Sequence, residues 1–192
     1  MNRLSRYGPE NRFSCVRGRG EVSLPVGCGV RLRLSVPQGR ARGSGRLRSP
    51  SALYPVETYI SVHSVEGLAA GLYHFDVEHF ALDRLTDQDK AEDVAQACLN
   101  QTFMSQAAAV FLWTGVFRRA MSKYGDRGMR YILLDAGHIC QNVMIAAEAV
   151  DCGGCPVGAF YDSELNQLLQ IDGEEESILY AASVGRKFLK AT

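Results

Sequence analysis

Three pairs of neighbouring residues in this sequence could do chemistry. A partly buried Lys with a lowered pKa, or a phenol beside it, can accept a proton, which describes Lys123–Tyr124. Gly158–Ala159 has minimal side chains, so backbone N–H groups there can approach a planar ring closely. Arg186–Lys187 follows a predicted strand, where two cations suit a phosphate. Each pair also has an ordinary interpretation: a helix end, a glycine needed for packing, and a solvated charge pair.

Other residue types that often carry chemistry lack suitable neighbours here. Cys152 and Cys155 have CxxC spacing, but zinc would need a second pair, and a redox pair normally opens a helix rather than following one. We interpret Asp151–Pro156 as a turn in which Gly153 or Gly154 adopts the left-handed backbone conformation. We interpret His138 as a structural histidine, and the sequence predicts no metal site.

The elements that must position these residues follow from the spacing of apolar residues. Arg130–Val150 has apolar residues at helical spacing on two faces, which predicts a central helix or one at a subunit interface. Strands and helices mix without clean βαβ repetition, so the predicted class is α+β. Asp87 and Asp162 are the expected helix N-caps. Strands are predicted at Thr58–Val65, Gly71–Asp76, Phe80–Leu85, Ala107–Thr114, Val157–Phe160 and Ile178–Val184, and shorter helices at Asp87–Leu99, Val116–Lys123 and Ser163–Leu169.

The first fifty residues differ in composition from the rest. The 192 residues include 21 basic and 21 acidic side chains, and this zero net charge excludes a uniformly basic nucleic-acid-binding protein. Residues 1–50 nevertheless hold eleven arginines and two glutamates, a net charge of +9. We divide the chain into an atypical Arg/Gly-rich segment, 1–48, with one short strand at Val30–Val36, and a domain, 49–192. The segment could be a partly disordered arm, a phosphate-contacting arm that orders on ligand binding or dimerisation, or a stretch from a shifted reading frame.

The distribution of apolar residues bears on where in the cell the protein is expected. The longest apolar run, Ala107–Trp113, is far shorter than the ~20 residues of a membrane span. No apolar stretch follows Arg3 and Arg6, so no signal peptide is predicted. Six scattered cysteines are too few for a disulfide scaffold. The sequence predicts a cytoplasmic protein with free thiols and no membrane contact.

Four motifs together resemble a known family: PSALYPVE (Pro50–Glu57), KYGDRGMRYILLDAGHICQN (Lys123–Asn142), CPVGAF (Cys155–Phe160) and SVGRK (Ser183–Lys187). Over about residues 48–188 the chain resembles the flavin-dependent nitroreductase superfamily. Within it, the chain is most similar to the SagB-type dehydrogenases, which oxidise azoline rings of peptides to thiazoles and oxazoles. The resemblance implies a nitroreductase-like three-layer α+β sandwich with a central mixed or antiparallel sheet and a long central dimer helix. It also implies an obligate homodimer with an FMN in each of two interface sites.

The resemblance also implies a role for each motif. Lys123 and Tyr124 would handle the proton when the substrate passes a hydride equivalent to flavin N5. Backbone donors after the CPV strand would point at N5, and basic residues would bind the phosphate. Arg3-Leu-Ser-Arg6 could be the N-terminal phosphate motif of the family, which is of the RxSxR kind. The implied cofactor-binding residues are Arg3, Arg6, Pro50, Ser51, Gly158, Ala159, Arg186 and Lys187.

The leading hypothesis is an FMN-dependent azoline dehydrogenase with a peptide substrate and cyclodehydratase partner proteins. An NAD(P)H-driven reductase of nitro or quinone compounds is the alternative within the superfamily. PSALYPVE is two residues shorter than the usual PSAGxLYPVE, which together with the unusual residues 1–50 keeps open a flavin-free structural or binding subunit. Nucleic-acid binding is not predicted, because only Tyr7 and Phe13 interleave the N-terminal arginines.

Overall fold

A computed structural model describes residues 53–77, 79 and 81–187, together with the backbone of three N-terminal strands. These strands are β1 (Arg12–Ser14), β2 (Glu21–Pro25) and β3 (Arg31–Ser35). β3 falls within the strand predicted at Val30–Val36, whereas β1 and β2 were not predicted. β2 and β3 pair with each other as a separate two-stranded sheet.

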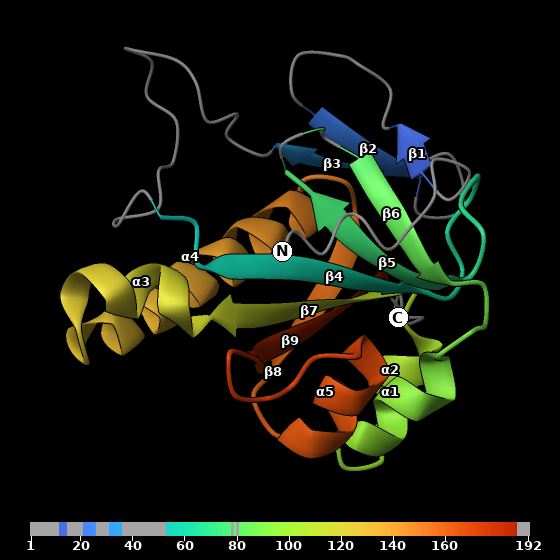
Figure 1. The fold of residues 1–192 in the computed structure, drawn as a ribbon. Helices are drawn as coiled ribbons and strands as arrows, with labels where there is room; N and C mark the ends of the chain where they lie inside the picture. The colour runs from blue at the N-terminus through green and yellow to red at the C-terminus, as the bar shows by residue number, and fades with distance from the viewer. Residues whose placement is uncertain are drawn as a thin grey trace.

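A seven-stranded sheet runs through the middle of the molecule (Figure 1). Its order is β1-β6-β5-β4-β7-β9-β8, and every neighbouring pair is antiparallel. β8 is therefore an edge strand. The six strands that follow β3 are β4 (Val56–Val62), β5 (Gly71–Asp76), β6 (Ala81–Thr86), β7 (Ala109–Val116), β8 (Cys152–Val157) and β9 (Glu176–Arg186).

The central strand β7 is buried almost throughout, which explains its continuous apolar sequence. Successive side chains of a strand point to opposite faces. Phe111 and Trp113 accordingly join the apolar cluster on one face, and Val110 and Leu112 join the cluster on the other. The sheet therefore separates two cores.

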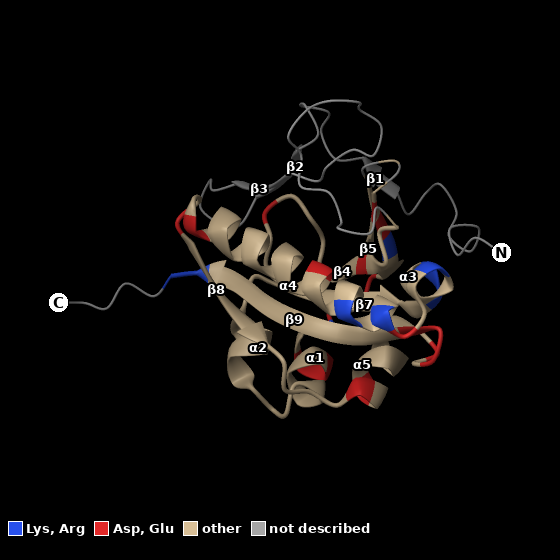
Figure 2. Ribbon diagram, turned by 90° about the vertical axis from the view of Figure 1, so that its left-hand side faces the viewer, with Lys and Arg blue, Asp and Glu red and all other residues tan. Residues whose placement is uncertain are grey.

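Helices cover both faces of the sheet (Figure 2). The long helix α4 (Arg127–Glu148) lies on one face, and α1 (Ala91–Ala97), α2 (Thr102–Gln106) and α5 (Asp162–Leu169) lie on the other. α3 (Phe117–Tyr124) continues from the end of β7 and packs against α4. The predicted α+β three-layer sandwich is confirmed. No helix in the described part of the chain is long and apolar enough to cross a membrane.

Some local predictions were wrong. Asp151–Pro156 is not a glycine turn: the left-handed residue is Asp151, with φ of 55°, and both glycines lie in the extended strand β8. Asp87 does not cap a helix, because α1 begins at Ala91, whose backbone N–H donates to the Asp89 carboxylate. Similarly, Asp162 is the first residue of α5 rather than its N-cap.

Candidate functional site

The strand pair β8–β9 carries two of the predicted pairs of site residues. Gly158–Ala159 follows directly after β8, and Arg186 ends β9. The pairing of Cys152 with Arg186, and of Val157 with Ala181, puts the two groups at opposite ends of β8. At about 3.4 Å per residue, the six positions between Cys152 and Gly158 span about 20 Å. These residues therefore form an extended edge rather than a compact cluster.

Packing within the chain does not explain why position 158 is a glycine. Gly158 is exposed, its φ is not positive, and an added Cβ would meet only Cε2 of Tyr180, at 3.8 Å. Gly154 in the same edge differs, because a Cβ there would lie 2.6 Å from Sδ of Met144. Gly154 therefore makes room for α4, whereas Gly158 leaves an open backbone surface of the kind that a flat ligand could approach.

The two cations at the other end of β8–β9 differ in their surroundings. Nζ of Lys187 lies 2.5 Å from Oε2 of Glu148 in α4, and this hydrogen bond raises the pKa of Lys187. Arg186 is exposed, and no salt bridge to it is found in the part of the chain that the structure describes. Arg186 can therefore meet an anion directly, whereas an anion at Lys187 would compete with Glu148.

Lys123 and Tyr124 lie together at the end of α3. Nζ of Lys123 is 5.0 Å from the centroid of the Tyr124 ring, and that ring meets Tyr131 of α4 edge-on at 4.9 Å. Gly125, with φ of 55°, ends α3 in a conformation that favours glycine. Lys123 is exposed, so the described residues do not supply the burial that was expected for it.

One chain does not unite all the predicted site residues. α3 begins after Val116, which pairs with Glu176 at the start of β9, whereas Arg186 ends the same strand. The ten residue steps along β9 put these two ends about 34 Å apart. The remaining predicted cofactor-binding residues, Arg3, Arg6, Pro50 and Ser51, lie outside the described residues.

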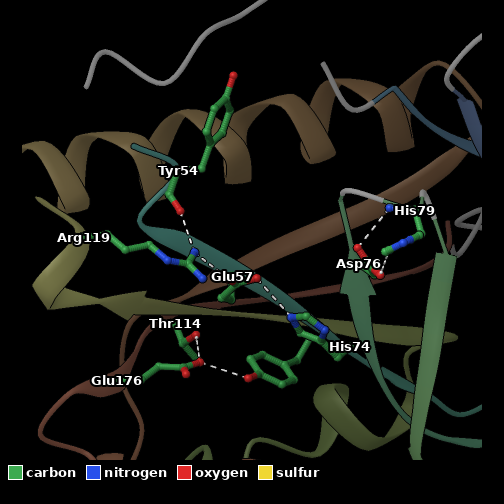
Figure 3. Close-up of polar contacts among 9 residues, drawn as sticks. Tyr54, Glu57, His74, Asp76, His79, Thr114, Arg119 and Glu176 are labelled. Carbon is green, nitrogen blue, oxygen red and sulfur yellow. Dashed lines mark hydrogen bonds and ion pairs between the residues drawn. The ribbon is translucent and has the colours of Figure 1, made fainter. Parts of the chain in front are cut away.

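A cluster that was not predicted lies where β4 begins (Figure 3). Nη1 of Arg119 in α3 is 2.5 Å from Oε1 of Glu57, and Nε2 of His74 in β5 is 3.0 Å from Oε2 of the same carboxylate. Burial raises the pKa of Glu57, but the hydrogen bond from His74 and the charge of Arg119 outweigh this effect, so the pKa is lowered. Glu57 is therefore a mostly buried carboxylate whose two oxygens are both engaged.

Tyr54 is tied to this cluster through its backbone. Nη1 of Arg119 donates to the Tyr54 carbonyl at 2.8 Å, and the next carbonyl, that of Pro55, accepts from the N–H of Val116 at 2.7 Å. Tyr54 has φ of 47°, an uncommon value for a residue with a side chain. The residue is 41% exposed, and its ring points away from Arg119 (Figure 3).

Two further polar contacts in Figure 3 have a structural role. Buried Glu176 accepts hydrogen bonds from Tyr59 at 3.0 Å and from Thr114 at 2.6 Å, which ties β9 to β4 and β7. Asp76 accepts hydrogen bonds from the backbone and the ring of His79 at the turn after β5. Neither contact involves a predicted site residue.

A groove of about 460 Å³ lies between the end of β6, α1 and α5. Polar side chains such as Lys90, Gln96 and Gln167 line it together with apolar ones. It contains none of the predicted site residues. Among the described residues, no three His, Cys, Asp or Glu side chains gather in a way that could hold a metal ion.

Comparison with known sequences gives consistent matches. Residues 47–186 match the model of the nitroreductase family. MJ1384 of Methanocaldococcus jannaschii, a protein named for that family, is 36% identical over 146 residues, which are 76% of this chain and 72% of MJ1384. The trifolitoxin-processing protein TfxB of Rhizobium leguminosarum bv. trifolii is 29% identical over 163 residues, covering 82% of this chain and 41% of TfxB.

Solved structures share the fold. A nitroreductase-family protein of Anabaena variabilis has a TM-score of 0.65 at 33% identity, covering 69% of this chain and 27% of that one. A chain of the E. coli microcin synthetase McbBCD complex, with truncated pro-MccB17 bound, has a TM-score of 0.67 at 22% identity, covering 77% and 58%. At 22% identity the second match bears on the fold alone. The chain thus spans only part of TfxB and of both solved chains.

Proposed function

Because this chain belongs to the nitroreductase family, we propose that it is an FMN-dependent oxidoreductase of the SagB type, which oxidises azoline rings of a peptide. One relative is named for processing trifolitoxin, and a chain of similar fold belongs to a microcin synthetase with a truncated pro-microcin bound. The name of the first relative favours a peptide substrate, and we propose partner proteins such as a cyclodehydratase. We also propose that it works as a homodimer in the cytoplasm.

The open backbone at Gly158 is the observation that carries this proposal. Neither packing nor backbone conformation requires a glycine at this position. A flat ring that lies against the backbone would require one, because a side chain would keep it away. Arg186, at the other end of the same strand pair, suits a phosphate because its guanidinium can bind two oxygens at once. The edge therefore fits an elongated cofactor with a ring at one end and a phosphate at the other.

Bound flavin would supply an acceptor for a hydride equivalent at N5. Backbone N–H groups at Gly158 and Ala159 would donate hydrogen bonds to the ring, which stabilises negative charge that develops there. Arg186 would hold the phosphate. Lys187 would also bind it if the ion pair between Lys187 and Glu148 broke. The substrate's proton would pass to the Lys123 amine or the Tyr124 oxygen, provided that a second chain or the peptide excludes water around them.

The first test is the absorption spectrum of the purified protein, followed by heat release and identification of any chromophore. We expect about one FMN per chain. Arg186→Ala should lose most of the flavin, and the matched control Arg118→Ala, another exposed arginine, should keep it. Lys123→Ala and Tyr124→Phe should keep the flavin but slow azoline oxidation. Full turnover in both of these variants would contradict the assigned proton role.

The alternative is an NAD(P)H-driven reductase, which the name of the M. jannaschii relative favours. Anaerobic bleaching of the flavin by NADH or NADPH, without a peptide, would select this alternative. A protein that stays colourless when FMN is added would instead identify a flavin-free structural or binding subunit.

A further inference from the structure

We propose that Arg119 is a positioning residue that fixes Tyr54 as an aromatic contact for the flavin ring. This inference rests on the proposed function and adds two residues to it. Neither residue belongs to the predicted site, since Arg119 had no assigned role and Tyr54 was noted only as part of the PSALYPVE motif. Three observations carry it: the backbone of Tyr54 is strained, its carbonyl is held, and its ring is left open.

The backbone of Tyr54 adopts a conformation that its own sequence disfavours. Its φ of 47° brings its Cβ close to the backbone, and few residues other than Gly, Asn or Asp adopt such values. A following proline normally pushes a residue towards extended conformations, and position 55 is a proline. Such a conformation persists only where the surroundings hold it, and residues of this kind cluster at functional sites.

A hydrogen bond from Arg119 to the Tyr54 carbonyl supplies that hold. Nη1 of Arg119 carries two hydrogens and makes both the 2.8 Å hydrogen bond to the Tyr54 carbonyl and the 2.5 Å ion pair with Glu57. The side chain of Glu57 is only 17% exposed, and His74 engages its other oxygen. The ion pair with Glu57 therefore fixes the Arg119 guanidinium, which can hold the Tyr54 carbonyl in one place.

These contacts bind the backbone of Tyr54 and leave its ring exposed. Figure 3 shows the carbonyl directed at Arg119 and the ring directed away from it, to the side of the sheet on which α4 lies. Glu57 and His74 lie on the opposite face, because His74 pairs with Tyr59, which faces α1 and α5. A rigid, exposed tyrosine offers a flat apolar face with a polar tip, which suits stacking or edge contact with an aromatic ligand.

Direct contact between Arg119 and the cofactor is a different explanation, and the geometry disfavours it. Its Nη1 is committed to Glu57 and to the Tyr54 carbonyl, on the side opposite the Tyr54 ring. If Arg119 acts through Tyr54, its removal matters only while the tyrosine ring is present. This condition can be tested with a double-mutant comparison.

The experiment is a titration of the apo-protein with FMN, followed by flavin fluorescence. Arg119→Met should weaken FMN binding about tenfold, and Tyr54→Leu should weaken it by a similar factor. In the Tyr54→Leu background, Arg119→Met should cost less than about twofold, because its target is already absent. The matched control Arg118→Met removes the same charge from the neighbouring position of α3 and should bind like the wild type.

Tyr54→Gly guards against a variant that simply fails to fold. Glycine accepts the positive φ, so this variant should unfold at a higher temperature than Tyr54→Ala while binding FMN about as weakly as Tyr54→Leu. If the ring acted only by stabilising the fold, FMN binding would instead strengthen with stability from Tyr54→Ala to Tyr54→Gly. Wild-type affinity in Tyr54→Gly or in Arg119→Met would overturn this inference alone. An equal loss from Arg119→Met in both backgrounds would also overturn it, and a wild type that binds no flavin would overturn the proposed function as well.

Discussion

Glu57 illustrates how the protein stabilises a charge that it also buries. Removing a carboxylate from water costs free energy, and this cost alone would favour the protonated form. His74 and Arg119 come from two other elements and engage one oxygen each, which more than offsets that cost. The ionised form therefore joins β4 to β5 and α3, and one side chain fixes three elements around Tyr54.

Replacing Glu57 by glutamine should destabilise the fold in a pH-dependent way. We expect Glu57→Gln to lower the free energy of unfolding by about 1–3 kcal/mol at pH 7, because an amide keeps the shape but not the charge. A carboxylate with a lowered pKa contributes stability above its ordinary value of 4.5 and loses it as the pH falls through the lowered value. The difference from wild type in denaturant titrations should therefore be present at pH 6 and shrink as the pH falls below about 4.5. Glu66→Gln, at an exposed glutamate, should show no such difference.

The candidate site could be predicted from the sequence only where its chemistry is local. Lys123 and Tyr124 are adjacent in sequence and do lie together, and the resemblance carried by the motifs is confirmed by the family match. The contact of Glu57 with Arg119 joins distant positions and depends on the pairing of β4 with β7, which sets where α3 begins. No motif encodes such a pairing, although a charged residue in the apolar start of a strand is the signal that could have drawn attention to Glu57.

At the scale of elements, glycines set how closely α3 and α4 approach. A Cβ at Gly128 would lie 2.9 Å from the backbone of Ala120 and Met121, so the two helices touch at that point. Backbone atoms cannot rotate away as a flexible side chain can. The close packing of α3 on α4 therefore fixes where Lys123 and Tyr124 stand.

Enlarging Gly128 should separate these helices. Gly128→Ala should lower the free energy of unfolding by about 1–3 kcal/mol, as overpacked sites do, and should be measured by thermal or chemical denaturation. The matched control is Gly153→Ala, whose Cβ would meet only Cγ of Lys187, at an ordinary 3.5 Å. We expect the control to change stability by no more than about 0.5 kcal/mol. Equal stability of the two variants would contradict the close contact at Gly128.

Most elements could be predicted from apolar periodicity, but β8 was missed, and the strand predicted at Val157–Phe160 overlaps it only at Val157. Its sequence, CGGCPV, is rich in Gly and Pro, which are depleted in strands and typical of turns. An edge strand tolerates proline, because one side of it makes no ladder. Gly154 is required by Met144 of α4, a contact that only the tertiary structure reveals.

The whole molecule leaves apolar side chains exposed along α4. Leu134 and Ile145 are 48% and 58% exposed, and their separation of eleven residues puts them on one face of the helix. At Gly137, on the same side, an added Cβ would meet no atom within 4 Å, so another surface could approach closely. A single chain also leaves Lys123 exposed and far from Arg186. A second copy on this face would cover the apolar residues and could complete a site between chains.

Charged substitutions on this face should separate the proposed dimer. Leu134→Glu and Ile145→Glu would each bury a carboxylate in the interface, which costs several kcal/mol without a partner, so both should sediment as monomers at concentrations where the wild type is a dimer. Leu99→Glu, at an exposed leucine on the α1 side of the sheet, should remain dimeric. Azoline oxidation should fall in parallel with the dimer, because one chain does not bring Lys123 and Arg186 together. Monomers that kept full turnover would place the reaction within a single chain, and variants that stayed dimeric would move the interface away from α4.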